Sequence, residues 1–234
     1  MKKIFNRTSL STIILMSITA VAITISTALC TTKYLLVIPL YVSLFISFLQ
    51  TRLIRYAYLI GGINSILYFV VYMYSGIPAT AFYALLFSFP LQIITFIRWT
   101  KNKRGTSTLL RRMTRRQQIW VALSFVAVWM VVFFMSRLMN SNFAILDTTS
   151  SMLGILTTFL TIFAFVEYTV LQIISGVANL SLYINIVSSG RGEQVPFLVY
   201  SVYSLICIFM AAVHAKRLYE KQCEEAKKEH TPTE

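Results

Sequence analysis

The side chains best suited to chemistry lie in apolar stretches, and all of them are uncharged. They are amides and phenols: Asn64, Gln92, Gln172, Asn179 and Asn185, with Tyr68, Tyr72, Tyr83, Tyr183, Tyr200 and Tyr203. Amides offer directional donors and acceptors, and aromatic faces stack on flat rings. This combination is suited to binding a neutral or delocalised ring compound that carries hydroxyl groups, such as a nucleoside or a vitamin.

Two of these amides are each followed four residues later by a tyrosine. The segments GGINSILY (61–68) and GVANLSLY (176–183) align at a shift of 115, so Asn64 matches Asn179 and Tyr68 matches Tyr183. Residues four apart share one face of a helix, and we therefore expect the two pairs to face each other across one cavity. A second interpretation stays open, because Asn and Gln in membrane helices often only bond to neighbouring helices, for about 0.6 kcal/mol each.

The sequence carries no recognisable catalytic machinery. It has no Ser/His/Asp set, no His/Glu metal cluster and no glycine-rich phosphate loop. Cys30, Cys207 and Cys223 match no metal motif, and we expect neither a disulfide nor a zinc site. We predict a protein that is not an enzyme and needs no cofactor or metal.

Composition identifies the medium in which these groups must act. Hydrophobic residues make up 57% of the 234 positions and charged residues only 12%, where soluble domains have about 25% charged residues. The net charge of +13 does not indicate nucleic-acid binding, because Lys and Arg lie in short gaps between uncharged runs. The sequence predicts an all-α integral membrane protein.

About 20 apolar residues are needed to cross a bilayer as a helix. The basic N-terminus before the first run resembles a signal peptide, but the run is too long for one, and we interpret it as a span. The long run 56–97 must break at Ser75-Gly76-Ile77-Pro78, and a later one near Glu167. The eight predicted spans are 8–30, 34–50, 54–74, 78–98, 118–136, 149–166, 169–187 and 195–215.

Basic residues orient these spans. The N-terminal segment, the second, fourth and sixth loops and the tail carry 18 of the 21 Lys and Arg, and the four opposite loops carry three. By the positive-inside rule, both termini are predicted to be cytoplasmic in a multi-pass protein of the cell inner membrane or plasma membrane. The eight basic residues within 98–116 are best interpreted as a topology anchor; binding of anionic lipid or a regulatory partner is the alternative.

The repeat determines the architecture. The third span maps onto the seventh, four crossings later, so the two units are parallel and a single helix must join them. Parallel repeats are one known transporter plan, with the substrate between the units near the midplane. We expect an extra N-terminal helix (1–32), a first three-helix repeat (33–99), a basic loop (100–117), a linking helix (118–137), a second repeat (148–215) and a charged tail (216–234).

No Asp, Glu, Lys or Arg lies clearly inside a predicted span. Ion-coupled transport commonly uses intramembrane carboxylates or histidines, so this pattern favours uncoupled movement of a small molecule. Trp99, which is soon followed by Lys101, lies where an interfacial anchor belongs.

These features resemble the PnuC-type vitamin transporters, a family best known for nicotinamide riboside. The segment Tyr83…Gln92-Ile93-Ile94-Thr95-Phe96-Ile97-Arg98-Trp99 lies where members carry an Asn-x-Tyr-Gly-Trp-x-x-Trp-like sequence, and Glu167 resembles the start of a Glu-x-Trp-x-x-Trp-x-x-x-Asn motif. The chain departs from both motifs. Gln92 and Phe96 replace Asn and Trp, Thr169 and Gln172 replace two tryptophans, and Gly176 stands at the second asparagine.

The resemblance implies a SWEET-like fold, a homotrimer and facilitated diffusion of a vitamin or nucleoside that a cytoplasmic kinase then traps. The expected substrate-binding residues are Asn64, Tyr68, Gln92, Trp99, Gln172, Asn179 and Tyr183. Gly61, Gly62, Gly76, Pro78, Pro90 and Gly176 are candidate hinges or, alternatively, points of close helix packing. Two other functions stay open: the substrate-binding membrane subunit of an ATPase-driven importer, and a non-transporting membrane scaffold.

Overall fold

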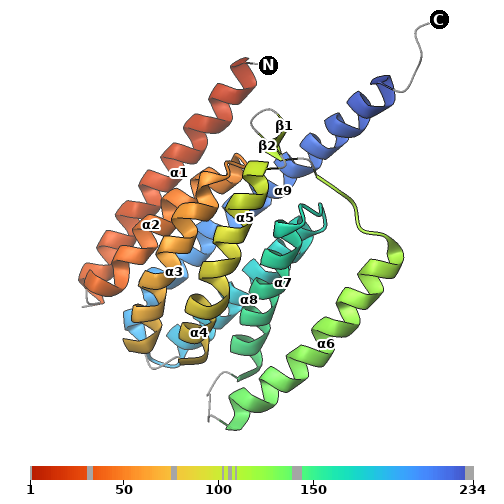
Figure 1. The fold of residues 1–234 in the computed structure, drawn as a ribbon. Coiled ribbons are helices and arrows are strands. Elements are labelled where there is room, and N and C mark those ends of the chain that lie inside the picture. The colour runs from red at the N-terminus through yellow and green to blue at the C-terminus, as the bar shows by residue number, and fades with distance from the viewer. Residues whose placement is uncertain are drawn as a thin grey trace, which may run out of the picture.

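The chain folds into a bundle of long helices with both termini at the same end (Figure 1). The structure, a computed structural model, describes residues 2–30, 34–74, 78–101, 103–104, 107–108, 110–138 and 144–229. In the described part, eight helical segments have the length and apolar composition to cross a membrane. The prediction of eight spans in an all-α membrane protein is therefore confirmed.

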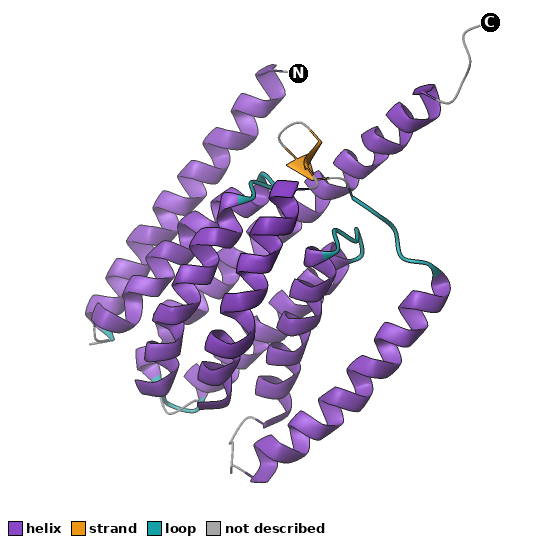
Figure 2. Cartoon of the chain, in the orientation of Figure 1, coloured by secondary structure: helices purple, strands orange, loops and turns teal. Residues whose placement is uncertain are grey.

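The helices follow the predicted spans closely. They are α1 (Lys2–Leu29), α2 (Tyr34–Thr51), α3 (Tyr56–Tyr74), α4 (Pro78–Tyr83), the π-helix η1 (Ala84–Ser88), α5 (Phe89–Lys101), α6 (Arg115–Leu138), α7 (Ala144–Ile162), α8 (Tyr168–Ser188), the 3-10 turn η2 (Gly192–Gln194) and α9 (Val195–Glu229). Figure 2 shows a small hairpin in the basic loop, formed by β1 (Lys103–Arg104) and β2 (Ser107–Thr108). The predicted break at Ser75-Gly76-Ile77 lies outside the described residues.

The fourth span is one continuous rod with an irregular middle, formed by α4, η1 and α5. Pro90 is the second residue of α5 and has no backbone N–H, so the carbonyl four residues before it loses its usual α-helical donor. A wider π turn just before the proline absorbs this mismatch. As a result Ser88 sits at the end of a displaced turn.

Several boundaries differ from the prediction: α1 begins at Lys2 rather than 8 and α7 ends at Ile162 rather than 166, and two further differences bear on the site and the tail. The sixth span begins at Ala144 rather than 149, which places Asp147 in the first turn of α7 with its side chain buried. A carboxylate there is favoured by the helix dipole, a local effect that hydropathy does not report. The last helix continues past 215 to Glu229, because its tail is rich in Lys, Glu, Gln, Leu and Ala, which are strong helix formers.

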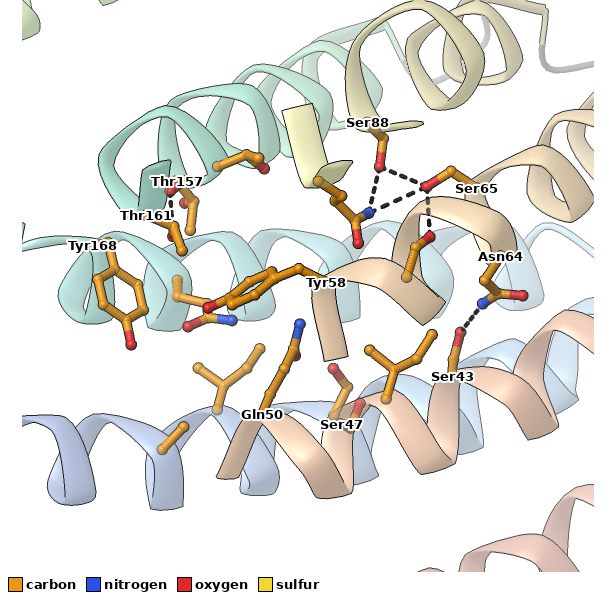
Figure 3. A pocket seen from close by; sticks show the side chains of 18 of the residues that line it. Ser43, Ser47, Gln50, Tyr58, Asn64, Ser65, Ser88, Thr157, Thr161 and Tyr168 are labelled. Atoms are coloured by element: carbon orange, nitrogen blue, oxygen red, sulfur yellow. Dashed lines mark hydrogen bonds between the residues drawn. The ribbon is translucent and has the colours of Figure 1, made fainter. Parts of the chain in front are cut away.

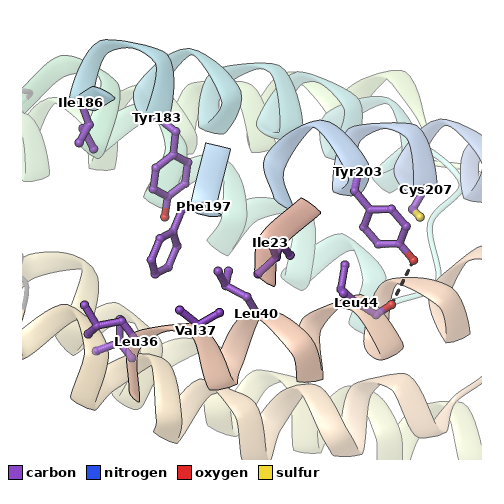
Figure 4. Packing of buried hydrophobic residues seen from close by; sticks show 11 residues of the cluster. Ile23, Leu36, Val37, Leu40, Leu44, Tyr183, Ile186, Phe197, Tyr203 and Cys207 are labelled. Atoms are coloured by element: carbon purple, nitrogen blue, oxygen red, sulfur yellow. Dashed lines mark hydrogen bonds between the residues drawn. The ribbon is translucent and has the colours of Figure 1, made fainter. Parts of the chain in front are cut away.

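The helices pack around a hydrophobic cluster shared by α1, α2, α3, α8 and α9 (Figure 4). Ile23 of α1 and Leu40 of α2 are fully buried in it, and the Tyr203 hydroxyl donates to the Leu44 carbonyl at 3.2 Å. The extra N-terminal helix is thereby attached to the bundle. On the opposite side of the molecule, α6 packs chiefly against α7 and presents many apolar side chains outward.

Candidate functional site

A cavity of about 270 Å³ lies between the first predicted repeat (α2, α3, η1 and α5) and the second (α7, α8 and α9). Figure 3 shows the amide, hydroxyl and phenol groups of its wall. Its lining comprises Ser43, Ile46, Ser47, Gln50, Leu53, Tyr58, Gly61, Asn64, Ser65, Tyr68, Ser88, Gln92, Thr157, Thr158, Thr161, Tyr168, Gln172, Tyr200, Ser204, Ile208 and Ala211. None of these lining residues is Asp, Glu, Lys, Arg or His.

Asn64 lines this cavity and also ties α3 to α2. Its amide nitrogen donates to the Pro39 carbonyl at 3.1 Å and to Ser43 Oγ at 2.8 Å, and the residue is 2% exposed. Both N–H groups are thus used within the protein, while Oδ1 is buried without a hydrogen-bond partner in the described structure. Ser43 also shares a 2.9 Å hydrogen bond with the Tyr68 hydroxyl.

Gln92 is held in one orientation by two serines. Its Nε2 donates to Ser88 Oγ at 2.8 Å and to Ser65 Oγ at 3.2 Å. Ser65 donates to the Gly61 carbonyl at 3.0 Å, and the two serine oxygens lie 2.8 Å apart. With Nε2 facing the serines, each of these four contacts has one hydrogen to share. If the amide were flipped so that Oε1 faced the serines, two of the four contacts would have no hydrogen. Gln92 therefore keeps Oε1 as an acceptor with no partner among the described side chains.

Gly61 makes room for that oxygen. A Cβ added at Gly61 would overlap Gln92 Oε1, so any larger residue would push the amide aside. A Cβ at Gly62, one position on, would meet the flexible end of Ile93, with Cδ1 at 3.0 Å and Cγ1 at 3.4 Å, and the Phe89 carbonyl oxygen at 3.5 Å. The requirement for glycine at 61 is therefore a close approach between α3 and α5 at the cavity.

The half of the cavity nearest α8's first turn is polar but less constrained. Gln50, Tyr58, Tyr168 and Gln172 line it, and their side-chain polar atoms have no hydrogen-bond partner among the described residues. Figure 3 shows Gln50 and Tyr58 directed toward the same space. One end of the cavity is thus preorganised by internal hydrogen bonds, and the other has free groups to meet a ligand.

Trp99 supports this wall from behind. It is 2% exposed, its indole N–H donates to the Thr161 carbonyl at 2.9 Å, and its ring packs edge-on to Tyr58 at 4.9 Å. The expectation of an interfacial anchor at Trp99 is wrong, because the indole finds its acceptor inside the bundle. Trp99 itself does not line the cavity, although Thr161 and Tyr58 do.

The structure brings together four of the seven predicted residues, Asn64, Tyr68, Gln92 and Gln172. It does not bring Asn179 and Tyr183 into this cavity. Asn179 accepts a 3.4 Å hydrogen bond from Ser150 of α7, and Tyr183 stacks on Phe197 of α9 in the hydrophobic cluster. Asn179 therefore faces α7 rather than the cavity, and Tyr183 belongs to the cluster that α8 and α9 share with α1, α2 and α3.

Several lining groups were not predicted from the sequence. Ser43, Ser47 and Gln50 follow one another at intervals of four and three residues, which places a polar stripe on one face of α2. That spacing was available from sequence, but Gln50 ends its apolar run and Tyr168 begins one. Their inward orientation depends on how helices meet, which local pattern does not specify.

The chain is similar to known proteins in sequence and in fold. A family model described as nicotinamide mononucleotide transporter matches residues 33–215. The chain belongs to this family. The fold also matches a crystal structure of the vitamin B3 transporter PnuC, with a TM-score of 0.75 and 19% identity over 90% of each chain. No curated protein sequence matches the chain.

Family membership confirms two predictions made from the residues. The chain is a membrane transporter of the PnuC type, and it is not an enzyme. Gln92 and Gln172 face the cavity, whereas Gly176 packs against Leu205 of α9, where a Cβ would lie 2.9 Å from Leu205 Cδ1.

Proposed function

We propose that the chain carries an unphosphorylated vitamin or nucleoside, in the class of nicotinamide riboside, through the cavity between its two repeats. The observation that supports this most directly is the lining: phenol rings to stack on a flat ring, amides and hydroxyls to bond with a sugar, and no charged side chain among the lining residues. The volume of about 270 Å³ is close to the lower end of small-molecule sites, about 300 Å³.

The same lining opposes a phosphorylated substrate. A phosphate monoester carries a charge of roughly −1.5 to −2 at pH 7, and burying it without a cation or several donors is costly. Asn64 and Gln92 both donate their amide N–H groups to other groups of the protein. Their remaining oxygens can only accept hydrogen bonds, so they cannot bind a phosphate. We therefore favour the riboside over the mononucleotide for which the family is described.

We further propose facilitated diffusion with both termini in the cytoplasm, where a kinase would trap the product by phosphorylation. The uncharged cavity supports uncoupled movement, and the distribution of Lys and Arg supports the orientation. A homotrimer is the assembly we propose, and the outward apolar face of α6 is available for it. Native mass spectrometry in detergent would measure that number directly.

The first experiment is thermal unfolding of the purified protein with nicotinamide riboside, its mononucleotide, thiamine, riboflavin and common nucleosides. A ligand at a hundredfold excess over Kd stabilises the folded state by about 2.7 kcal/mol. We expect a shift with one unphosphorylated ring compound and none with the mononucleotide. A shift with the mononucleotide alone would refute the proposed substrate class.

Proteoliposomes then separate the alternatives. A facilitator equilibrates its ligand when reconstituted alone, a subunit of an ATPase-driven importer binds but does not equilibrate, and a scaffold does neither. We expect equilibration without ATP. Binding without equilibration would overturn the proposed mode of transport while leaving the site in place.

A further inference from the structure

The floor of the cavity is formed by a second hydrophobic cluster, which includes part of the basic loop. Leu110 and Met113 are 5% and 7% exposed, and they share this cluster with Leu53, Trp99 and Tyr168. Leu53 and Tyr168 also line the cavity. We call residues 110–113 the strap, and the end of the bundle that holds both chain termini the terminal face. The strap crosses the terminal face between α9 and the start of α6 (Figure 1).

The backbone of the strap is bonded to the second repeat. Arg111 N–H donates to the Ala164 carbonyl and Val166 N–H donates to the Arg111 carbonyl, both at 2.8 Å, which makes a parallel bridge opposite Phe165. Leu110 N–H donates to Gln222 Oε1 of α9 at 3.0 Å. The strap is thus attached both to the turn between α7 and α8 and to α9.

Met113 and Arg112 add a third attachment through Glu167. Met113 N–H donates to Glu167 Oε1 at 3.1 Å, and Arg112 Nε lies 4.0 Å from the same oxygen. The other carboxylate oxygen, Oε2, is buried without a hydrogen-bond partner in the described structure. Glu167 therefore has hydrogen-bond and ion-pair partners on one carboxylate oxygen only, and the second oxygen is buried without the hydrogen bonds that would compensate for its loss of water.

Two backbone positions at the same floor are strained. Leu53 has φ 54° and Ala164 has φ 55°, and among the described residues no other non-glycine has positive φ. Such conformations persist only where surrounding contacts enforce them, and they concentrate at switching elements. Ala164 carries the carbonyl that binds Arg111, and Leu53 contributes to the cluster that receives Leu110 and Met113.

We infer that the strap is the gate of the terminal face: seated, it seals the cavity floor, and its release opens the cavity to that side. Along the chain the strap lies between α5 and α6. Its backbone bonds hold it to the second repeat, and its apolar side chains share a cluster with Leu53 and Trp99 of the first. When the repeats move apart and the strap stays with Leu53 and Trp99, its backbone bonds to Ala164 and Val166 have to break. The strain at Ala164 and Leu53 and the half-satisfied Glu167 favour release once those contacts are lost. This inference rests on the proposed function for its physiological meaning, but not for its test.

The test that needs no substrate measures access to the cavity. In a background of Cys30→Ala, Cys207→Ala and Cys223→Ala, Ser47→Cys supplies one thiol on the cavity wall, and a membrane-impermeant maleimide is added from the terminal face. Gln222→Leu removes one attachment of the strap, and we expect labelling to accelerate roughly fivefold, the effect of losing one hydrogen bond. Gln118→Leu, an exposed glutamine on α6, is the matched control and should leave the rate unchanged.

A crosslink supplies the opposite test. Arg111→Cys with Phe165→Cys places two thiols across the parallel bridge, where facing residues are close enough for a disulfide. Oxidation should abolish labelling of Ser47→Cys from the terminal face, and reduction should restore it. Unchanged labelling in both the crosslinked and the Gln222→Leu proteins, or no crosslink at all, would overturn the gate. If the crosslink and Gln222→Leu change the labelling rate as expected but the protein transports no vitamin or nucleoside, the gate stands and the proposed function is refuted.

Discussion

At the scale of single residues, Asn64 and Gln92 are both amides in predicted spans, but they differ in whether their carbonyl oxygen can reach a ligand. Asn64 is buried, and the structure uses it mainly to join α3 to α2 through Pro39 and Ser43. Gln92 is held by Ser65 and Ser88 so that its oxygen is left over at the cavity. The first amide should matter for stability and the second for binding.

Replacing Gly61 by Ala should weaken ligand binding without unfolding the protein. The added methyl would occupy the place of Gln92 Oε1 and turn the amide away from its serines. One hydrogen bond is worth about 0.5–1.5 kcal/mol, so we expect Kd to rise by roughly two- to tenfold in calorimetry. Gly62→Ala is the control for the same helix, and an equal loss in both variants would contradict this account.

Asn64→Ala should act on stability instead. Interhelical hydrogen bonds in membrane proteins are worth about 0.6 kcal/mol on average, and Asn64 donates two, so the free energy of unfolding should fall by about 1 kcal/mol. Because Asn64 Oδ1 is buried, affinity should change less than twofold. A large loss of affinity with unchanged thermal stability would show that Asn64 contacts the ligand directly.

At the scale of elements, the two repeats use matching residues differently. Tyr68 bonds to Ser43 at the cavity, whereas Tyr183 stacks on Phe197 in the hydrophobic cluster. We expect Tyr68→Phe to raise Kd several-fold, by loss of one hydrogen bond worth about 1 kcal/mol, and Tyr183→Phe to leave it unchanged. Isothermal titration of both variants measures this, and equal effects would indicate a symmetric site.

The π turn before Pro90 is the element that positions Ser88. Pro90→Ala restores a backbone N–H, so η1 can relax to a regular α-helix and rotate Ser88 away from Gln92. Melting temperature should stay constant or rise while Kd increases by roughly fivefold, again one hydrogen bond. A lowered melting temperature with unchanged Kd would mean that the π turn serves packing only.

The sequence was sufficient to predict the elements because lipid imposes a single rule, that every backbone group must be paired within a helix. Eight spans followed from uncharged runs, and Asn64, Tyr68, Gln92 and Gln172 were found as polar exceptions inside them. What could not be predicted depended on how helices rotate against each other. Gln50 turns inward from a helix end, and Asn179 turns toward α7, for reasons of packing that no local pattern carries.

At the scale of the whole molecule, the lining contains no acidic, basic or histidine side chain. Coupling to protons or sodium requires a group that changes charge or binds an ion along the path. Uptake into proteoliposomes should therefore keep the same rate between pH 6 and 8 and in the presence of ionophores. Asp147, the buried acid in the first turn of α7, is the residue to replace. If uptake depends on a proton or sodium gradient and that dependence disappears in Asp147→Asn, transport is coupled rather than uncoupled.

The length of α9 has a consequence outside the membrane. Its 35 residues extend roughly 50 Å at 1.5 Å per residue, well beyond the ~30 Å of hydrocarbon. The C-terminal end of α9 extends past the neighbouring helices (Figure 1), so the helix is a stiff lever with one arm inside the bundle and the other outside it. A small tilt within the bilayer becomes a larger sweep at its tip. A fluorophore on that arm would report each turnover of the carrier in real time, without touching the cavity.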